Sequence, residues 1–352
     1  MGRIPHDKRI TMRDDSITIA KAWGIFLMVL AHSFFSVSGE RWIGMFHMPV
    51  FFFFAGYCFK TKYLTDFRTF AWNRVRGLYV PFVKWGLIFL LLHNVFFHLH
   101  LYDDTYGMGD IVSHLYGWKE TWHIAVSVVT AMAGNEQLLG GFWFLKSLFV
   151  ASLTGYAVIR YVKDVRWGMI ALLAGTLALS AAHTKVLYFF NPRELFATLF
   201  FVTGYVYKQK QCSMHTHVWV LPVGWTMVTL GAMCWPTCML TFTWQQVLPY
   251  YLTAICGILS TFVLSTWMNG RKGLVRRGFI YIGNHTLTIL IWHFLCFKLV
   301  SLCIVKLYGL PIERLAEFPV LVTYSRQGWF VLYVLVGMGV PLLFSKVGFL
   351  KK

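Results

Sequence analysis

Charged residues are scarce in this sequence. Lys, Arg, Asp and Glu make up only 13% of its 352 residues, whereas hydrophobic residues make up 57%, and the mean hydropathy is +0.59. About a quarter of the residues in a typical soluble domain are charged. The scarcity of charge therefore excludes an ordinary soluble protein and indicates a chain that crosses a membrane several times.

Three further features are missing. The seven cysteines lie mostly inside apolar runs, which excludes a disulfide framework, and only Cys234 and Cys238 are placed so that they could pair. No standard zinc-ligand spacing is present, so we expect no metal. There is also no clear internal repeat, and in particular no inverted pair of broken spans of the kind that many transporters contain.

What the sequence does contain is a series of apolar runs close to the length that crosses a bilayer. We predict an all-α polytopic membrane protein with about ten transmembrane helices. The predicted spans are 17–37, 42–59, 78–99, 138–159, 167–183, 194–207, 218–239, 247–267, 279–302 and 328–345. Residues 122–133 form a shorter run that contains His123, and they predict a re-entrant or interfacial segment.

The formal net charge is +18, from 32 basic and 14 acidic residues. The basic residues are not gathered on one soluble domain, so we expect no nucleic-acid partner. They alternate with the spans, at 8–13, 60–76, 160–166, 208–210, 271–277 and 351–352. By the positive-inside rule both termini are cytoplasmic, with an N-terminal segment at 1–16, a membrane domain at 17–346 and a tail at 347–352.

The first span carries two polar residues, Lys21 and His32, eleven positions apart. Eleven helical residues bring two side chains back to nearly the same face and separate them by about 16 Å along the axis. A histidine inside a bilayer must face protein or water, and it can exchange a proton near neutral pH. His32 is thus a candidate general base, although a neighbouring carbonyl could also satisfy it. Lys21 could bind a ligand or simply extend to the membrane surface.

Two more histidines stand in later spans. His47 opens the second span next to Pro49, and Gly56 further along it allows another helix to approach closely. His293 lies well inside the ninth span. Each of these histidines could contribute to a site near His32 or be structural.

Other candidates lie near the ends of spans. Arg74 and Arg76 precede Pro81 and could hold a phosphorylated ligand, or serve only as topology determinants. Trp143 begins an aromatic patch in the fourth span that could line a site or belong to an interfacial belt. A last group could form a metal or sugar site, and consists of His93, His98, His100, Asp103 and Asp104.

These residues occur in an order that resembles acyltransferase family 3, whose membrane-bound members O-acylate cell-surface carbohydrates. The resemblance rests on KAWGIFLMVLAH at 21–32, FHMPVFFFFAGY at 46–57, NRVRGLYVP at 73–81, WFLKSLF at 143–149 and IGNHTLTILIWH at 282–293. The subgroup it most resembles contains the fucose-4-O-acetylase-like proteins. Many relatives have an aspartate three residues before the basic residue of the first helix, where this chain has Thr18, and the arginine pattern before Pro81 aligns loosely.

The resemblance implies an O-acyltransferase that takes an acyl group, most often acetyl, from cytoplasmic acyl-CoA. The acceptor would be a hydroxyl of a cell-surface or lipid-linked saccharide on the outer side of a bacterial inner membrane. Lys21, Arg74 and Arg76 would bind the donor, and His32 would act as a general base or form an acyl-histidine. His47, Trp143 and His293 would shape the acceptor end or stabilise the oxyanion.

Two other classes of function remain open from the sequence. A transporter or flippase of a lipid-linked saccharide would also contain intramembrane histidines and broken helices. A structural partner in a polysaccharide-assembly complex would leave the histidines unexplained.

Overall fold

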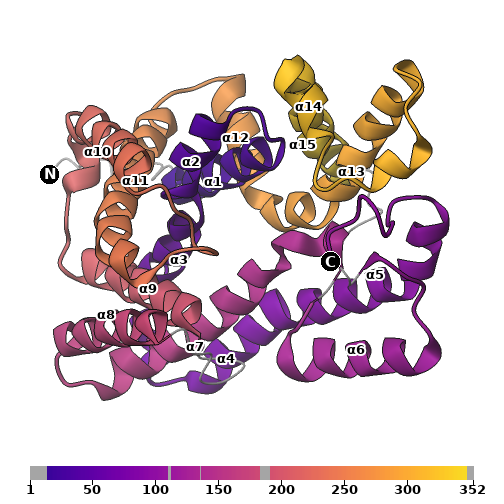
Figure 1. Ribbon diagram of the computed structural model, residues 1–352. Coiled ribbons are helices and arrows are strands. Elements are labelled where there is room, and N and C mark those ends of the chain that lie inside the picture. Colours follow the sequence, from indigo (N-terminus) through magenta and orange to yellow (C-terminus); the bar gives the residue numbers. More distant parts are fainter. Residues whose placement is uncertain (1–13, 110–111, 135, 183–190, 347–352) are drawn as a thin grey trace, which may run out of the picture.

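The computed structural model describes residues 14–109, 112–134, 136–182 and 191–346, and this part of the chain folds into helices without a strand (Figure 1). The first 74 residues contribute four α-helices and one 3₁₀-helix. Their bounds are α1 Ser16–His32, α2 Val37–Gly44, α3 His47–Tyr57, η1 Thr61–Leu64 and α4 Phe67–Arg74. The predicted segments at 1–16 and 347–352 lie mostly outside the described residues, so their cytoplasmic location stays a prediction.

The middle of the chain continues from α4 without a break, through a π-helical turn, into α5. Its elements are η2 Val75–Tyr79, α5 Val80–His98, α6 Trp118–Ala131, η4 Gln137–Phe142, α7 Trp143–Tyr161, α8 Val165–Ala181 and α9 Pro192–Gln209. The last third contains η5 Met214–Thr216, α10 Val220–Cys234, η6 Trp244–Gln246, α11 Val247–Asn269, α12 Leu274–Asn284 and α13 Thr286–Leu307. It ends with η7 Ile312–Ala316, α14 Val322–Tyr324, η8 Ser325–Trp329 and α15 Phe330–Lys346.

Several helices are built to cross a bilayer. Within the described residues, five continuous helical segments are long and apolar enough for this, at 67–98, 137–161, 244–269, 286–307 and 322–346. Three shorter apolar helices, α1, α8 and α10, accompany them. The chain is therefore an integral membrane protein of the all-α class. The number of ten crossings stays a prediction, although each predicted span is helical over most of its described residues.

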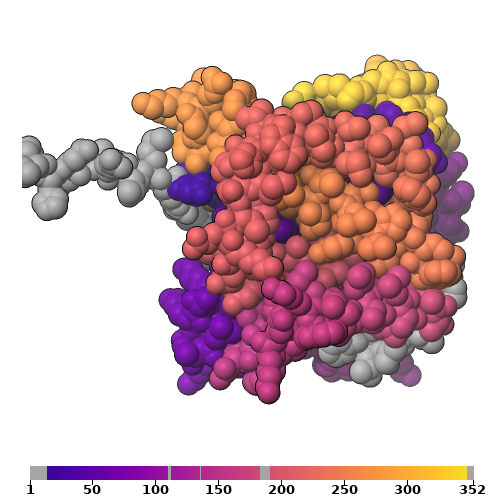
Figure 2. Space-filling model, turned by 90° about the vertical axis from the view of Figure 1, so that its left-hand side faces the viewer, coloured from indigo at the N-terminus to yellow at the C-terminus, as the bar shows by residue number. Residues whose placement is uncertain are grey.

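Helix α1 lies at the centre of the bundle. It packs against α2, α3, α11, α12, α13 and α15. On the face shown in Figure 2, α10 and α11 cover most of the N-terminal helices. Because α1 carries both Lys21 and His32, its central position places the two residues inside the protein rather than against lipid.

Glycines let two of these helices approach until their backbones touch. A Cβ atom on Gly56 of α3 would overlap the carbonyl oxygen of Phe201, and one on Gly204 of α9 would overlap that of Phe53. The close approach that the sequence predicts at Gly56 is thus made by α9. It fixes the position of α3, and hence of His47 at its start.

Two predicted spans are broken rather than continuous. The predicted span 42–59 divides between α2 and α3 at Met45 and Phe46, so Pro49 lies in the first turn of α3, where its missing N–H is tolerated. The predicted span 279–302 divides at His285, between α12 and α13. The continuous membrane-length helix of the predicted ninth span is therefore α13, which begins at Thr286 and ends at Leu307.

The break at His285 has a local cause. In a continuous helix the backbone N–H of His285 would donate to the carbonyl of Tyr281. Instead the imidazole Nδ1 of His285 donates to that carbonyl, at 2.7 Å, and the backbone N–H bonds to Ile282, at 2.9 Å. The side chain has replaced its own backbone as the donor, and a new helix starts at Thr286.

Helix α6 runs antiparallel to α5 (Figure 1). Just before α6 begins, Tyr116 and Asn94 exchange two hydrogen bonds, of 2.9 and 3.0 Å. Near its end, the carbonyl of Val129 accepts a bond of 2.7 Å from the Tyr79 hydroxyl. The helix thus begins beside Asn94, near the C-terminal end of α5, and ends beside Tyr79, just before the N-terminal end of α5.

The chain then returns to the side from which α6 started. Gly134 lies beside Phe82, and Glu136 lies 3.3 Å from the imidazole of His93, almost level with Asn94. Both ends of the segment 116–136 therefore lie at the same end of α5. That residues 122–133 form a re-entrant or interfacial segment stays a prediction.

Replacing Gly56 by alanine tests the contact between α3 and α9. The added Cβ would meet a backbone oxygen that cannot rotate away, so we expect a loss of about 1–3 kcal/mol of stability, a typical cost of overpacking. The measurement is the thermal unfolding midpoint of the purified protein in detergent. Gly339→Ala is the matched control, because nothing lies within 4 Å of its added Cβ. Equal midpoints for the two variants would contradict the close approach.

Candidate active site

Three histidines from three different helices converge at one end of α1. His32 is the last residue of α1, His47 the first of α3, and His293 lies in the second turn of α13. The Nδ1 atom of His32 lies 3.1 Å from the Nε2 atom of His293, and the two rings are nearly parallel, at 12°. His47 is near enough for its charge to act on His32.

The hydrogen bonds of His293 determine which nitrogen carries the proton on each ring. Its Nδ1 atom lies 3.0 and 3.1 Å from the carbonyls of Ile289 and Leu290. Carbonyls only accept, so Nδ1 of His293 must carry the hydrogen, and Nε2 of the neutral ring is an acceptor. His32 must then donate from its own Nδ1. This leaves the lone pair on Nε2 of His32 available.

The three imidazoles differ in exposure, and that of His32 is the most exposed. His293 is completely buried and His47 is 8% exposed, whereas His32 is partly exposed. The Nδ1 atom of His47 also donates to a carbonyl, that of Ile43, at 2.8 Å. Both nitrogens of His293 are thus engaged, and neutral His47 has no N–H left to donate.

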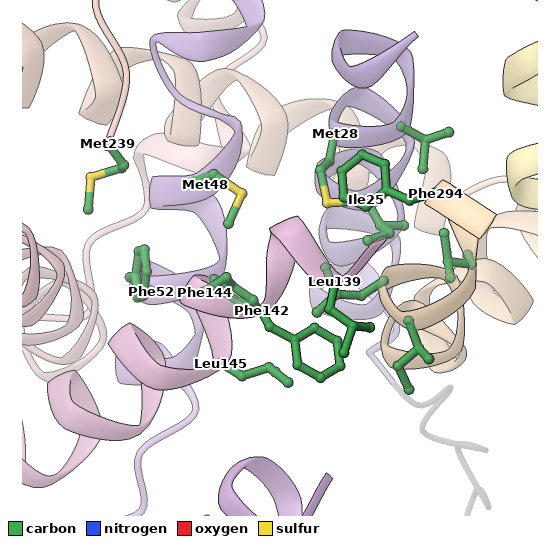
Figure 3. Close-up of a cluster of buried hydrophobic side chains, with 14 of the residues drawn as sticks. Ile25, Met28, Met48, Phe52, Leu139, Phe142, Phe144, Leu145, Met239 and Phe294 are labelled. Carbon is green, nitrogen blue, oxygen red and sulfur yellow. The ribbon is translucent and has the colours of Figure 1, made fainter. Parts of the chain in front are cut away.

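An apolar cavity of about 300 Å³ runs along α1 below the histidines. It begins beside Lys21 and Cys58 and ends at Met28, one helical turn before His32. Its other walls come from α3, the π-helical turn, α7 and the first turns of α13, namely Met48, Phe51, Phe54, Ala55, Gly77, Leu78, Phe144, Leu145, Leu148, Thr286, Leu287 and Leu290, with Ile17 and Ile25 of α1. Figure 3 shows Ile25, Met28, Met48, Phe144 and Leu145 converging, with Phe294 next to Met28.

Basic side chains surround the Lys21 end of the cavity. Lys21, Lys60, Arg74 and Lys208 all lie close enough to the Cys58 thiol to act on it electrostatically. The Nε atom of Arg74 is buried without a hydrogen-bond partner among the described residues. The cavity therefore has a positive end at Lys21 and an imidazole pair beyond its other end.

The comparison with protein-family models decides which family this arrangement belongs to. The model of the acyltransferase domain of acyltransferase family 3 matches residues 14–346, almost the whole chain. This protein belongs to acyltransferase family 3. Neither the comparison with curated proteins nor that with solved structures gives a match. The chain is thus a membrane acyltransferase, and the three histidines, the cavity and the basic end all lie within the matched residues.

In this acyltransferase, two predicted site residues lie apart from the others. Arg76 is exposed, whereas Arg74, two residues earlier, lies by Cys58. Trp143 at the start of α7 stacks under the guanidinium of Arg193, at 5.1 Å from the ring centroid, and no histidine contact accompanies it in the described residues. The prediction grouped Arg76 with Lys21 and Arg74, and Trp143 with His47 and His293, because sequence position does not say which face of a helix a residue occupies.

Sequence reasoning missed four charged residues near these sites. Lys60 and Lys208 were interpreted only as topology determinants, and Arg193 and Glu194 were not among the predicted site residues. The signal for Glu194 was available, because an acidic residue within an apolar run is costly unless it has a purpose.

The outer group around His93 is packed rather than open. The imidazole of His93 lies between Glu136, at 3.3 Å, and the carbonyl of His114, at 3.1 Å, and it stacks on the ring of Tyr116. No cluster of three or more metal-binding side chains occurs in the described part of the chain.

Proposed function

We propose that this acyltransferase moves an acetyl group from cytoplasmic acetyl-CoA to a saccharide hydroxyl on the outer side of a bacterial inner membrane, as a fucose-4-O-acetylase-like protein. The observation that carries the proposal is the imidazole of His32, whose Nε2 atom is free to accept a proton. It lies one helical turn beyond an apolar cavity with a basic mouth. The basic side chains that would bind the donor and the imidazole that would act as the base thus lie toward opposite ends of the cavity.

The donor would enter from the basic end. The phosphates of coenzyme A carry several negative charges, which Lys21, Lys60, Arg74 and Lys208 would neutralise. The Nε atom of Arg74 is buried and has no partner in the described residues, so it would donate a hydrogen bond to one of these phosphates. From Lys21 to His32 the helix rises about 16 Å, a length comparable to an extended pantetheine arm. The arm would fill the cavity and bring the thioester carbonyl to His32.

The chemistry then needs one proton to move. The acceptor hydroxyl would donate its proton to Nε2 of His32 while its oxygen attacks the thioester carbonyl. When the tetrahedral intermediate collapses, the carbon–sulfur bond breaks and the His32 imidazolium returns the proton to the leaving thiolate. The products are the acetyl ester and free coenzyme A. Attack by Nε2 of His32 on the thioester, giving an acyl-histidine that the hydroxyl then resolves, uses the same geometry.

His293 would act as a positioning residue. Its Nε2 atom accepts the Nδ1–H bond of His32, and this bond strengthens when the His32 ring becomes positively charged. Because both nitrogens of His293 are engaged, with His32 and with the carbonyls of α13, we do not assign it a contact with the acceptor or the oxyanion. His47 would shape the acceptor end, and it could stabilise an oxyanion only when protonated.

Replacing His32 by glutamine tests the proposed base. The amide keeps a polar side chain of similar length but cannot take a proton, so we expect acyl transfer to fall by at least about 100-fold, the lower range for loss of general acid–base catalysis. The measurement is mass spectrometry of glycans after incubation of the purified protein with isotope-labelled acetyl-CoA. Label in the glycan from the wild type supports the enzyme, and unmodified glycan moved across a vesicle membrane would support a flippase instead. Wild-type transfer by the glutamine variant would contradict the role of His32.

The neighbouring arginines provide a matched pair for the donor site. Arg74→Ala should raise the KM for acetyl-CoA by about tenfold, the effect of losing a charge-assisted hydrogen bond worth 1.4 kcal/mol or more. Arg76→Ala should leave the KM close to that of the wild type, because its side chain is exposed. Both variants remove one positive charge from the same turn. Equal changes in the KM would show that only the general charge of this region matters.

A further inference from the structure

One buried carboxylate is not used by the proposed reaction. Glu194 lies in the first turn of α9 and is completely buried. Lys146 and Ser147 of α7 face it, and Lys146 is only 8% exposed. Acidic and basic side chains inside a membrane protein are costly, and they usually mark a pathway or a binding site.

The two oxygens of this carboxylate are in very different situations. The Oε1 atom accepts three hydrogen bonds, from Ser147 Oγ at 2.9 Å and from Nε and Nη2 of Arg193 at 3.2 and 3.1 Å. The Oε2 atom is buried and has no hydrogen-bond partner among the described residues. Lys146 acts on the carboxylate electrostatically.

A second unpartnered acceptor lies close by. Asn191 occupies the residue before α9, where its side chain would ordinarily cap the helix, but it makes no capping bond. Its Oδ1 atom is also buried without a partner in the described part of the chain. Two oxygen acceptors, three positions apart in the sequence, therefore lack a donor among the described residues, which is uncommon for buried polar atoms.

The chemistry of these atoms limits the kind of ligand. Both unpartnered atoms accept hydrogen bonds, so the ligand must bring hydrogens of its own. A fully ionised phosphate or carboxylate has none to give, and Nε and Nη2 of Arg193 already bond to Glu194 while the guanidinium lies over one face of Trp143. A metal cation is disfavoured by the two positive side chains beside the carboxylate. A neutral compound with several hydroxyl groups fits both oxygens.

An aromatic ring and a partly open edge accompany the two acceptors. Trp143 is partly exposed, and the side chain of Arg193 is 25% exposed. A pyranose has polar hydroxyls around its edge and a C–H face that packs against an aromatic ring. The oxygens of Glu194 and Asn191 could accept hydrogen bonds from the hydroxyls. The ring of Trp143 could pack against the C–H face.

This group lies at the same end of α7 as the histidine pair. Gly141, two residues before Trp143, is next to Leu290 and the imidazole of His293. The end of η4 therefore lies beside the histidine pair, and the first turns of α7 lie beside Arg193 and Glu194. The basic cluster at Lys21 lies at the opposite end of the cavity.

We propose that Glu194, Asn191 and Trp143 form a saccharide subsite that holds a sugar ring of the acceptor while another of its hydroxyls is presented to His32. The subsite rests on the proposed function for the identity of the acceptor as a saccharide. Glu194 Oε2 and Asn191 Oδ1 accept hydrogen bonds from the ring hydroxyls, and Trp143 packs against the ring. Arg193 and Ser147 hold the carboxylate in place.

The test compares binding and transfer in matched variants. Purified protein in nanodiscs is titrated with methyl glycosides of glucose, galactose, mannose and rhamnose, with tryptophan fluorescence as the readout, and acetyl transfer from labelled acetyl-CoA is measured in parallel. Glu194→Gln keeps the shape of the side chain but weakens the acceptor at Oε2. We expect it to weaken glycoside binding and raise the acceptor KM at least tenfold, with the KM for acetyl-CoA unchanged.

Two further variants separate binding from folding. Asn191→Ala removes the second acceptor at the rim and should also raise the acceptor KM, without touching the carboxylate. Ser152→Ala is the control, because Ser152 is equally buried in α7 but its hydroxyl bonds only to the carbonyl of Leu148 in its own helix. Its binding and kinetics should match those of the wild type.

The outcomes distinguish the subsite from the proposed reaction. If the wild type transfers acetyl groups but Glu194→Gln and Asn191→Ala leave the acceptor KM unchanged, the subsite is wrong and the reaction stands. If the wild type binds a glycoside in a Glu194-dependent way but transfers no acetyl group, the subsite stands and the reaction is wrong. If no glycoside binds to the wild type, the subsite is overturned.

Discussion

The arrangement of the active site depends on one hydrogen bond, between Nδ1 of His32 and Nε2 of His293. Its direction is set by the backbone of α13, because the carbonyls of Ile289 and Leu290 hold the hydrogen of His293 on Nδ1. The hydrogen bonds are therefore donated from His32 to His293 and from His293 to the carbonyls of α13, which leaves Nε2 of His32 as an acceptor. An imidazole that points its lone pair away from its own partner is ready to accept a proton from a substrate.

Much of the fold serves to place these two rings. Helix α1 can bring His32 to α13 because six other helices surround it. The break at His285 makes α13 a separate helix, whose first turns line the cavity. The close contact of α3 with α9 fixes the third histidine, His47. A pair of rings held from several directions keeps its geometry, which catalysis by positioned groups requires.

Charge is separated along the cavity. The basic residues gather at the Lys21 end, the walls are apolar, and the imidazoles lie past the far end. Apolar walls exclude water, and a low dielectric makes each remaining charge act more strongly. This explains how α1 can be stable inside a membrane although it carries Lys21 and His32. Each of the two residues lies toward one end of the cavity, away from lipid.

The sequence predicts the central part of this arrangement because helical spacing is regular. Lys21 and His32 share a face of α1, and Gly56 predicts a close helix contact, which α9 provides. The break at His285 was not predictable, because it depends on an imidazole taking the place of a backbone donor. That Arg74 lies near the Cys58 thiol while Arg76 is exposed was not predictable either, because the two residues share one turn and the sequence does not show which side chain faces the protein. Glu194 meets Ser147, and Arg193 meets Trp143, only through the packing of α7 on α9, which no local pattern records.

The most direct test of the account is nitrogen NMR of the protein labelled with ¹⁵N at histidine, with the signals of His32 and His293 assigned by their loss in alanine variants. Near pH 8 both residues should be neutral and carry the hydrogen on Nδ1, and the Nδ1 of His32 should show coupling through the hydrogen bond to Nε2 of His293. A His32 ring that carries its hydrogen on Nε2 would contradict the account, because no lone pair would then face the substrate.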